Sequence, residues 1–350
     1  MNGYFNEKQG VKDLRLALLN VVQKLDCSNL SFINSKVIPT KDSALNVLRN
    51  MSQKDFINYG MKGDKSASDL SVILGTIVGR TRSSGEISLL VSDFIFCPSK
   101  ANGLTSLGPD AEKVSITNVF KNKNLAVAIF KFSGEFSGTF YTGHFDKNGQ
   151  EIYYKIQQKR PFYIWAIGGE REIGWLMKKV DLSNVGIQNS LCLTMGGKSV
   201  EYHLVPRKGI YDVDRRDNKH AVSASKGRNG FVLDFEASLQ DLPLPEEYLC
   251  DTANYTTSDD NYVVESVRKV DGKYRISIRG TKVRAGNLSV NLKMRIPQWV
   301  EDCDMNPEWD IRKAGYGGCT FGFKALVSGV LDAMSSSSEG KYVMFNLKIN

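Results

Sequence analysis

Several signatures of familiar enzyme classes are missing from this sequence of 350 residues. It has only three histidines, and its six cysteines are scattered singly without a CxxC pair, so we do not expect a zinc site. It also lacks a GxSxG nucleophile elbow, a P-loop and the glycine pattern of dinucleotide-binding proteins. The sequence therefore identifies no catalytic residue.

Long apolar segments are missing as well. No apolar run reaches the roughly 18 residues that a membrane helix needs. Residues 1–13 lack the basic and then apolar segments of a secretory signal. Single cysteines are typical of free thiols in a reducing compartment. We expect a cytoplasmic protein that does not bind a membrane.

The net charge is positive, at +8, from 46 basic and 38 acidic residues. Such an excess permits an acidic partner, including nucleic acid. The densest basic groups are Lys159 with Arg160, Lys178 with Lys179, and Arg215 with Arg216. No RRM, KH or zinc-finger motif accompanies them. A solvated basic surface is therefore the simpler interpretation, and nucleic-acid binding remains an alternative.

The stretch Glu86–Phe96 reads EISLLVSDFIF and is predicted to be a central buried strand. Its apolar run is continuous, which is typical of a parallel strand covered on both faces. Asp93 follows this run. Because ligands bind beyond the carboxyl ends of strands in open α/β sheets, we expect Asp93 at a functional edge.

The first half of the chain alternates between predicted helices and strands. This order predicts an α/β domain over residues 1–183, with a doubly wound, mainly parallel, Rossmann-like sheet and an inserted hairpin at about 136–158. The predicted helices cover 11–25, 42–50, 70–78 and 171–179, and the predicted strands cover 30–38, 86–96, 124–132, 138–142, 151–157 and 161–167. The polar stretch 97–118 is predicted to be a surface loop.

Residues 184–350 have a different pattern, with short alternating segments separated by turns. This pattern predicts an antiparallel β-sandwich domain with a terminal helix at about 321–334. The predicted strands cover 199–205, 230–237, 261–270, 274–279, 288–296 and 341–349.

Residues 1–180 resemble a von Willebrand factor A-like (vWA) domain. Leu89-Leu90-Val91-Ser92-Asp93 is similar to the third metal-binding loop of that family. Ala67-Ser68-Asp69-Leu70 is similar to the second, with Ser68 at the threonine position, and Met1–Tyr4 looks like the segment that follows the DxSxS motif. The chain contains no DxSxS motif. The resemblance therefore implies a degenerate Mg²⁺ site formed by Asp93, Ser68 and Asp69.

These residues also have purely structural explanations. Ser68 and Asp69 are suited to cap a helix, and Asp93 is suited to cap the next loop. Glu170 and Arg171 follow another predicted strand end, where they either face the same crevice or simply begin a helix. Aromatic residues gather between 130 and 165 and fit a core, but any that point outward from a projecting hairpin would suit a protein partner.

The favoured hypothesis is a non-catalytic subunit for protein interaction or assembly, in which Glu170, Arg171, Lys159 and Arg160 contact the partner. One alternative is a metal-dependent hydrolase acting on a phosphate-containing substrate through Asp93, Asp69 and Glu170. Another is a basic nucleic-acid-binding subunit. That hypothesis requires the basic residues named above to form one continuous stripe.

Overall fold

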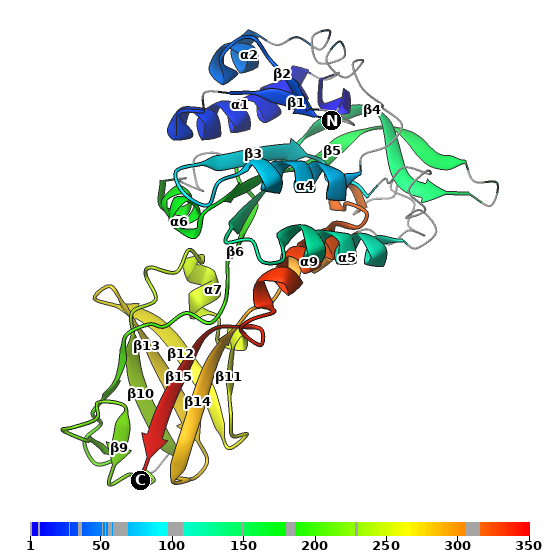
Figure 1. The fold of residues 1–350 in the computed structure, drawn as a ribbon. Helices are drawn as coiled ribbons and strands as arrows, with labels where there is room; N and C mark the ends of the chain where they lie inside the picture. The colour runs from blue at the N-terminus through cyan, green and yellow to red at the C-terminus, as the bar shows by residue number, and fades with distance from the viewer. Residues whose placement is uncertain are drawn as a thin grey trace. The chain divides into compact units, whose positions relative to one another are not determined.

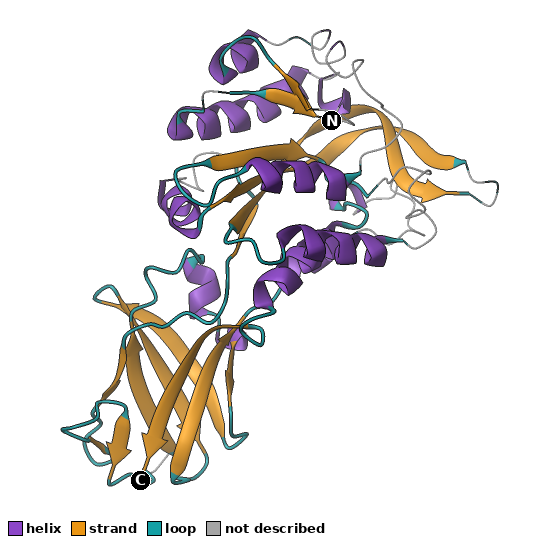
Figure 2. Ribbon diagram, viewed as in Figure 1, coloured by secondary structure: helices purple, strands orange, loops and turns teal. Residues whose placement is uncertain are grey.

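The structure is a computed structural model. It describes residues 2–5, 8–27, 29–33, 37–50, 52, 54, 58, 69–96, 108–146, 148, 150–179, 186–227, 230–304 and 316–350. The chain forms two compact units. Unit 1 consists of Met1–Leu193 and Ile296–Ala333, and unit 2 consists of Thr194–Arg295 and Met334–Asn350. Each unit is described separately below, and Figures 1 and 2 show their elements.

Unit 1 combines a central sheet with helices on both faces. Its helical elements are η1 (Asn2–Phe5), α1 (Lys8–Leu25), α2 (Ala44–Asn50), α4 (Leu70–Arg80), α5 (Pro109–Phe120), α6 (Glu170–Lys179), α8 (Gln298–Asp302), η5 (Tyr316–Gly318) and most of α9 (Phe323–Ser335). Its strands are β1 (Ser31–Ile33), β2 (Val37–Pro39), β3 (Ile87–Ser92), β4 (Ala126–Phe145), β5 (Glu151–Gly168) and β6 (Asn189–Leu193).

The central sheet has the strand order β3-β5-β4-β6, and every neighbouring pair in it is antiparallel. This overturns the prediction of a doubly wound, mainly parallel sheet, and with it the vWA-like and Rossmann-like interpretation. The sequence misled because a continuous apolar run reports burial on both faces rather than strand direction. The predicted strand at 30–38 is likewise two short antiparallel strands, β1 and β2.

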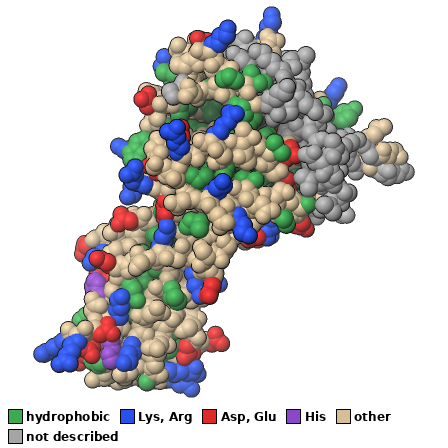
Figure 3. Space-filling view, in the orientation of Figure 1, with side chains coloured by type: hydrophobic (Ala, Val, Ile, Leu, Met, Phe, Trp, Pro, Cys, Tyr) green, Lys and Arg blue, Asp and Glu red, His purple; other side chains and the backbone are tan. Residues whose placement is uncertain are grey.

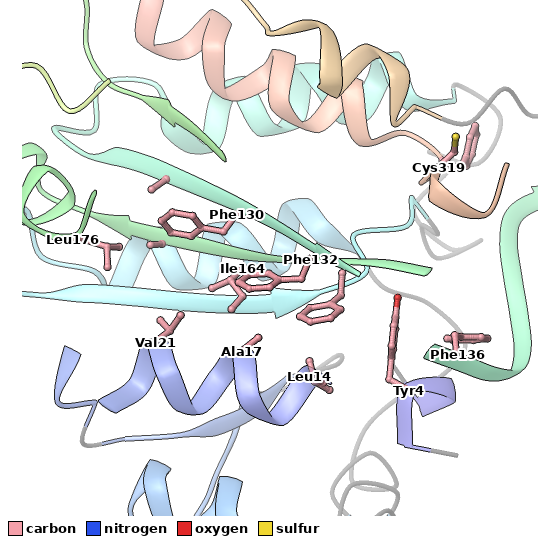
Figure 4. Packing of buried hydrophobic residues seen from close by; sticks show 14 of the residues in the cluster. Tyr4, Leu14, Ala17, Val21, Phe130, Phe132, Phe136, Ile164, Leu176 and Cys319 are labelled. Atoms are coloured by element: carbon pink, nitrogen blue, oxygen red, sulfur yellow. The ribbon is translucent and has the colours of Figure 1, made fainter. Parts of the chain in front are cut away.

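Helices cover both faces of this sheet. On one face, side chains of η1, α1 and α6 pack against alternate residues of β4 and β5. Figure 4 shows the α1 side chains Leu14, Ala17 and Val21 pointing toward the sheet. On the other face, Phe94 stacks on Trp165 and Phe323 of α9 stacks on Tyr163, with ring centroids 4.7 and 4.1 Å apart. The two faces of β5 therefore belong to two separate layers of side chains.

The β4–β5 hairpin extends well beyond the rest of the sheet, as Figure 1 shows. β6 pairs only with Val127–Lys131 of β4, and β3 pairs only with Tyr163–Gly168 of β5. From Ser133 to Pro161 the hairpin has two strands, and we call this part the arm. The strands predicted separately at 124–132 and 138–142 are thus parts of one strand, β4. Those predicted at 151–157 and 161–167 are parts of one strand, β5.

Helix α5 lies where the sequence predicted a surface loop. It begins with Pro109 and has Asp110 and Glu112 in its first turn, which are favourable features at a helix start. Its buried side chains Glu112, Ile116 and Phe120 recur at helical spacing. The prediction was wrong because polar residues surround this narrow apolar stripe.

Unit 2 contains two sheets with the orders β12-β13-β10-β7 and β11-β14-β15-β9-β8. The Phe345 ring of the second sheet contacts the rings of Tyr202 and Phe235 of the first, at centroid distances of 5.2 and 5.0 Å. One pair, β9 with β15, is parallel, so the second sheet is mixed. The elements are β7 (Tyr202–Val205), β8 (Asp212–Val213), β9 (His220–Val222), β10 (Phe231–Ala237), α7 (Glu246–Cys250), η4 (Thr252–Asn254), β11 (Tyr255–Thr257), β12 (Tyr262–Val270), β13 (Lys273–Gly280), β14 (Gly286–Lys293) and β15 (Lys341–Ile349).

Candidate functional site

The arm presents a polar outer face that ends in an aromatic pair. Every second residue of each strand lies on this face. The residues paired across the two strands are Glu135 with Lys159, Ser137 with Gln157, Thr139 with Lys155, and Tyr141 with Tyr153. Tyr141 and Tyr153 are 52% and 59% exposed, and their ring centroids are 6.0 Å apart. The two rings form an exposed aromatic patch, and such patches are typical of interaction surfaces.

The opposite face of the arm is buried. Phe132, Phe136, Phe140, Ile156 and Phe162 belong to the core that contains Tyr4 and Leu14. The Tyr4 hydroxyl donates a hydrogen bond to the Pro161 carbonyl, at 2.5 Å. Because one face is anchored in this way, the outer face is held in a fixed register.

Asp93 follows β3 and lies near Tyr4 and Arg160, with which it interacts electrostatically. Burial raises the pKa of Asp93, and the Arg160 guanidinium acts in the opposite direction. Because β3 and β5 are antiparallel, the end of β3 pairs with Tyr163 near the middle of β5. Asp93 therefore does not lie at a shared carboxyl edge of parallel strands.

Arg160 is 2% exposed, so it is a core residue and not part of the surface. Its Nη1 donates a hydrogen bond to the Gly317 carbonyl at 3.0 Å. Burial lowers the pKa of Arg160, and the acidic groups around it act in the opposite direction. The adjacent Lys159 is 72% exposed and lies 3.9 Å from Glu135. The two predicted partner-contacting cations thus point to opposite faces of the arm.

Asp69 caps helix α4: its Oδ1 accepts hydrogen bonds from the Val72 amide at 3.1 Å and the Ser71 hydroxyl at 2.7 Å. The structure brings it close to Glu112 of α5, a residue that sequence reasoning missed. Burial, followed by the charge of Asp69, raises the pKa of Glu112 to about 7, although the Ser71 amide offsets part of this. Both carboxylate oxygens of Glu112 are buried.

The remaining predicted site residues lie at the start of α6. Glu170 and Arg171 are in its first turn, and Arg171 Nη2 lies 2.9 Å from Glu172 Oε1. Ser68 lies outside the described residues. In the described ranges, no group of three or more His, Cys, Asp or Glu side chains is placed to hold a metal ion. The Mg²⁺ site at Asp93, Ser68 and Asp69 stays a prediction.

A second polar cluster surrounds Tyr163 on the other face of the sheet. The Tyr163 hydroxyl and Thr320 Oγ1 are 3.2 Å apart, and burial raises the pKa of Tyr163 well above its ordinary value. Lys131 Nζ donates a hydrogen bond to Cys303 Sγ at 2.9 Å. Sequence reasoning missed this cluster because its members come from β4, β5 and the segments around α8 and α9, far apart in the chain.

Basic side chains do not gather on the face of the molecule that Figure 3 shows. Among the described residues, Lys and Arg are scattered over both units there and are interleaved with Asp and Glu. The burial of Arg160 also removes one member of the stripe that nucleic-acid binding requires.

No protein family, curated protein or solved structure matches the chain. None of the helices in the described ranges is both long and apolar enough to pass through a bilayer.

Proposed function

We propose that this protein is a non-catalytic interaction or assembly subunit that binds an acidic protein surface through the outer face of the arm. The exposed pair Tyr141 and Tyr153 carries the proposal, since tyrosine is enriched at the centres of protein interfaces and can bury a large area at low entropic cost. Its position on an extension of two strands makes it reachable by a partner.

The charge of the arm supports an acidic partner. Lys155 lies on the outer face next to the aromatic pair, and Lys159 lies farther along the same face. The acidic side chains described in the arm are Glu135 on this face and Asp146 at the turn. The net charge of +8 acts in the same direction over a longer range. Electrostatic complementarity of this kind chiefly raises the rate of association.

The proposal places the protein in the cytoplasm. Five described cysteines, Cys27, Cys192, Cys250, Cys303 and Cys319, are free, as in proteins of reducing compartments.

Selection of a displayed peptide library on the full chain tests the proposal. We expect enriched peptides that are rich in Asp and Glu and that bind with an affinity lowered at least tenfold by Tyr153→Ser or Lys155→Glu. Trp175→Ser is the matched control, because Trp175 is an exposed aromatic residue, 44% exposed, on α6 and outside the arm.

Two outcomes contradict the proposal. The first is enrichment of peptides whose affinity the arm variants leave unchanged. The second is binding of a single-stranded DNA 20-mer that falls steeply with salt while acidic peptides do not bind, which favours the nucleic-acid alternative.

A further inference from the structure

Cys303 and Cys319 lie on neighbouring segments of unit 1. Cys303 follows α8, and Cys319 follows η5. The Thr320 amide donates a hydrogen bond to the Cys303 carbonyl at 2.7 Å, and Asp304 and Thr320 form a parallel bridge. Cys303 directly precedes Asp304, and Cys319 directly precedes Thr320. The two cysteines therefore lie opposite each other on adjacent stretches of chain.

This spacing is compatible with a disulfide. Adjacent bridged chains lie about 4.8 Å apart, and disulfides join residues whose Cα atoms are roughly 4.4–6.8 Å apart. The two side chains also share neighbours: the phenol of Tyr163 interacts electrostatically with both thiols, and so does the ammonium group of Lys131. Both sulfur atoms thus belong to the same polar cluster.

Two cationic side chains give this cluster positive charge. Lys131 Nζ lies 2.9 Å from Cys303 Sγ, and an ammonium group can only donate hydrogen bonds, so the sulfur accepts. A thiolate is the stronger acceptor and is the nucleophilic form of cysteine. The Arg160 guanidinium adds a second positive charge near Cys319.

Cys319 differs from Cys303 in its surroundings. Its Sγ donates a hydrogen bond to the Asp302 carbonyl at 3.5 Å, and burial raises its pKa. Because its thiol proton is held by this carbonyl, Cys319 is suited to react second.

We propose that Cys303 and Cys319 form a reversible thiol–disulfide pair that is oxidised by hydroperoxides, with Cys303 as the attacking and Cys319 as the resolving thiol. This inference does not depend on the proposed function. It adds a modification site to a protein with free thiols, since disulfides in reducing compartments are usually transient and responsive to oxidants.

The chemistry balances as follows. The Cys303 thiolate attacks one oxygen of the hydroperoxide, an S–O bond forms and the O–O bond breaks. The leaving oxygen takes a proton and departs as an alcohol, or as water from hydrogen peroxide. The Cys319 sulfur then attacks the Cys303 sulfenic acid, an S–S bond forms, and the S–O oxygen leaves with the thiol proton as water. The two thiols are oxidised by two electrons and the peroxide is reduced.

Two other described cysteines provide a comparison. Cys192 is fully buried in the central sheet, and burial raises its pKa far above the ordinary value. Cys250 belongs to unit 2, on α7. They therefore serve as internal controls.

Peptide mass mapping of the full chain tests the proposal. The protein is reduced, treated with a small molar excess of hydrogen peroxide, alkylated and digested without reductant. We expect a linked peptide that joins Cys303 to Cys319, about 2 Da lighter than the sum of the two thiol peptides, and we expect dithiothreitol to reverse the link.

Variants assign the two roles. Cys319→Ser is expected to stop at a Cys303 sulfenic acid that dimedone traps, and Cys303→Ser is expected to abolish both products. Cys192→Ser and Cys250→Ser should leave the linked peptide unchanged. Circular dichroism of each variant shows whether it folds.

Lys131→Met tests the role of the lysine. Because the variant removes the positive charge that donates to Cys303 Sγ, we expect hydrogen peroxide to oxidise Cys303 several-fold more slowly near pH 7 in the folded variant. The proposal is overturned if the folded wild-type chain yields no Cys303–Cys319 link. It is also overturned if Cys303 links only to another cysteine, or if a product about 14 Da heavier joins Lys131 to Cys303 in place of the disulfide.

Discussion

The guanidinium carbon of Arg160 lies 4.1 Å from the centroid of the Phe140 ring, with both side chains buried in the arm. A desolvated cation over an aromatic face is stabilised by the ring quadrupole. Arg160→Met removes this contact, the hydrogen bond to Gly317 and a charge that compensates Asp93. We expect the free energy of unfolding to fall by about 3 kcal/mol, as when one partner of a buried ion pair is removed, measured by urea denaturation.

The adjacent Lys159 provides the control for that prediction. Its side chain is 72% exposed, and it lies 3.9 Å from Glu135, so Lys159→Met should change the free energy of unfolding by less than about 0.5 kcal/mol. If both variants lost the same free energy of unfolding, the contacts of the buried Arg160 would not stabilise the fold.

Glu112 makes stability depend on pH. Its pKa in the folded state, about 7, lies above the ordinary value of 4.5, so the folded state binds the proton more tightly than the unfolded state. The contribution of Glu112 to the free energy of unfolding should therefore be largest below pH 4.5. It should be lost as the pH rises through 7, by up to roughly 3 kcal/mol. Glu112→Gln should remove that fall. Urea denaturation at pH 5, 6, 7 and 8 measures it.

Asp110→Asn on the same helix is the matched control, because Asp110 is exposed in the first turn of α5. It should leave the pH dependence of unfolding as in the wild type. A Glu112→Gln profile that still falls between pH 5 and 8 by as much as the wild type would contradict the assignment to Glu112.

Asp69 combines a helix cap with a charge that acts on Glu112, and two substitutions separate these roles. Asparagine caps helices about as well as aspartate, so Asp69→Asn should keep helix α4 while the pKa of Glu112 falls below about 7. Asp69→Ala loses the cap as well as the charge, so it should be less stable than Asp69→Asn by about 1 kcal/mol at every pH. The midpoint of the pH profile of unfolding measures the first effect, and an unchanged midpoint in Asp69→Asn would contradict it.

Gly329 allows α9 to approach α5 closely. A Cβ at this position would lie 2.6 Å from the Lys113 carbonyl oxygen and 2.9 Å from Ile116 Cβ. Gly329→Ala should therefore lower the free energy of unfolding by about 1–3 kcal/mol, measured by urea denaturation. A Cβ at Gly79 in α4 would meet nothing within 4 Å, so Gly79→Ala should raise stability by about 0.5–1 kcal/mol through helix propensity alone. The same sign for both variants would refute the close approach.

The periodicity of the sequence located most helices and strands but not the direction of the strands. Residues 11–25 and 70–78 were predicted as helices and form most of α1 and α4, and both predictions are confirmed. Strand direction depends on which segments meet, and neither the burial nor the spacing of Leu89, Leu90 and Val91 encodes that. Pro161 divided β5 in the prediction, yet the two-stranded arm accommodates it because the missing amide is needed only in a strand paired on both sides.

The site residues divide in a similar way. Asp69 was recognisable as a helix cap because capping depends on residues two or three positions away. Glu112 was hidden inside a stretch read as a loop, and its burial depends on α4, more than 30 residues earlier in the sequence. The neighbours Lys131 and Cys303 are 172 residues apart, a contact that no local pattern predicts. Proximity of this kind requires the fold itself.

The division of unit 1 into Met1–Leu193 and Ile296–Ala333 has a consequence for synthesis on the ribosome. Helix α9 covers Tyr163 and packs on α5, but residues 194–295 are translated before it. At roughly 5–20 residues per second, one apolar layer of the sheet waits on the order of ten seconds for its cover. During that interval the nascent chain exposes a surface that chaperones bind, so its yield in the cell should depend on elongation rate and on chaperone supply.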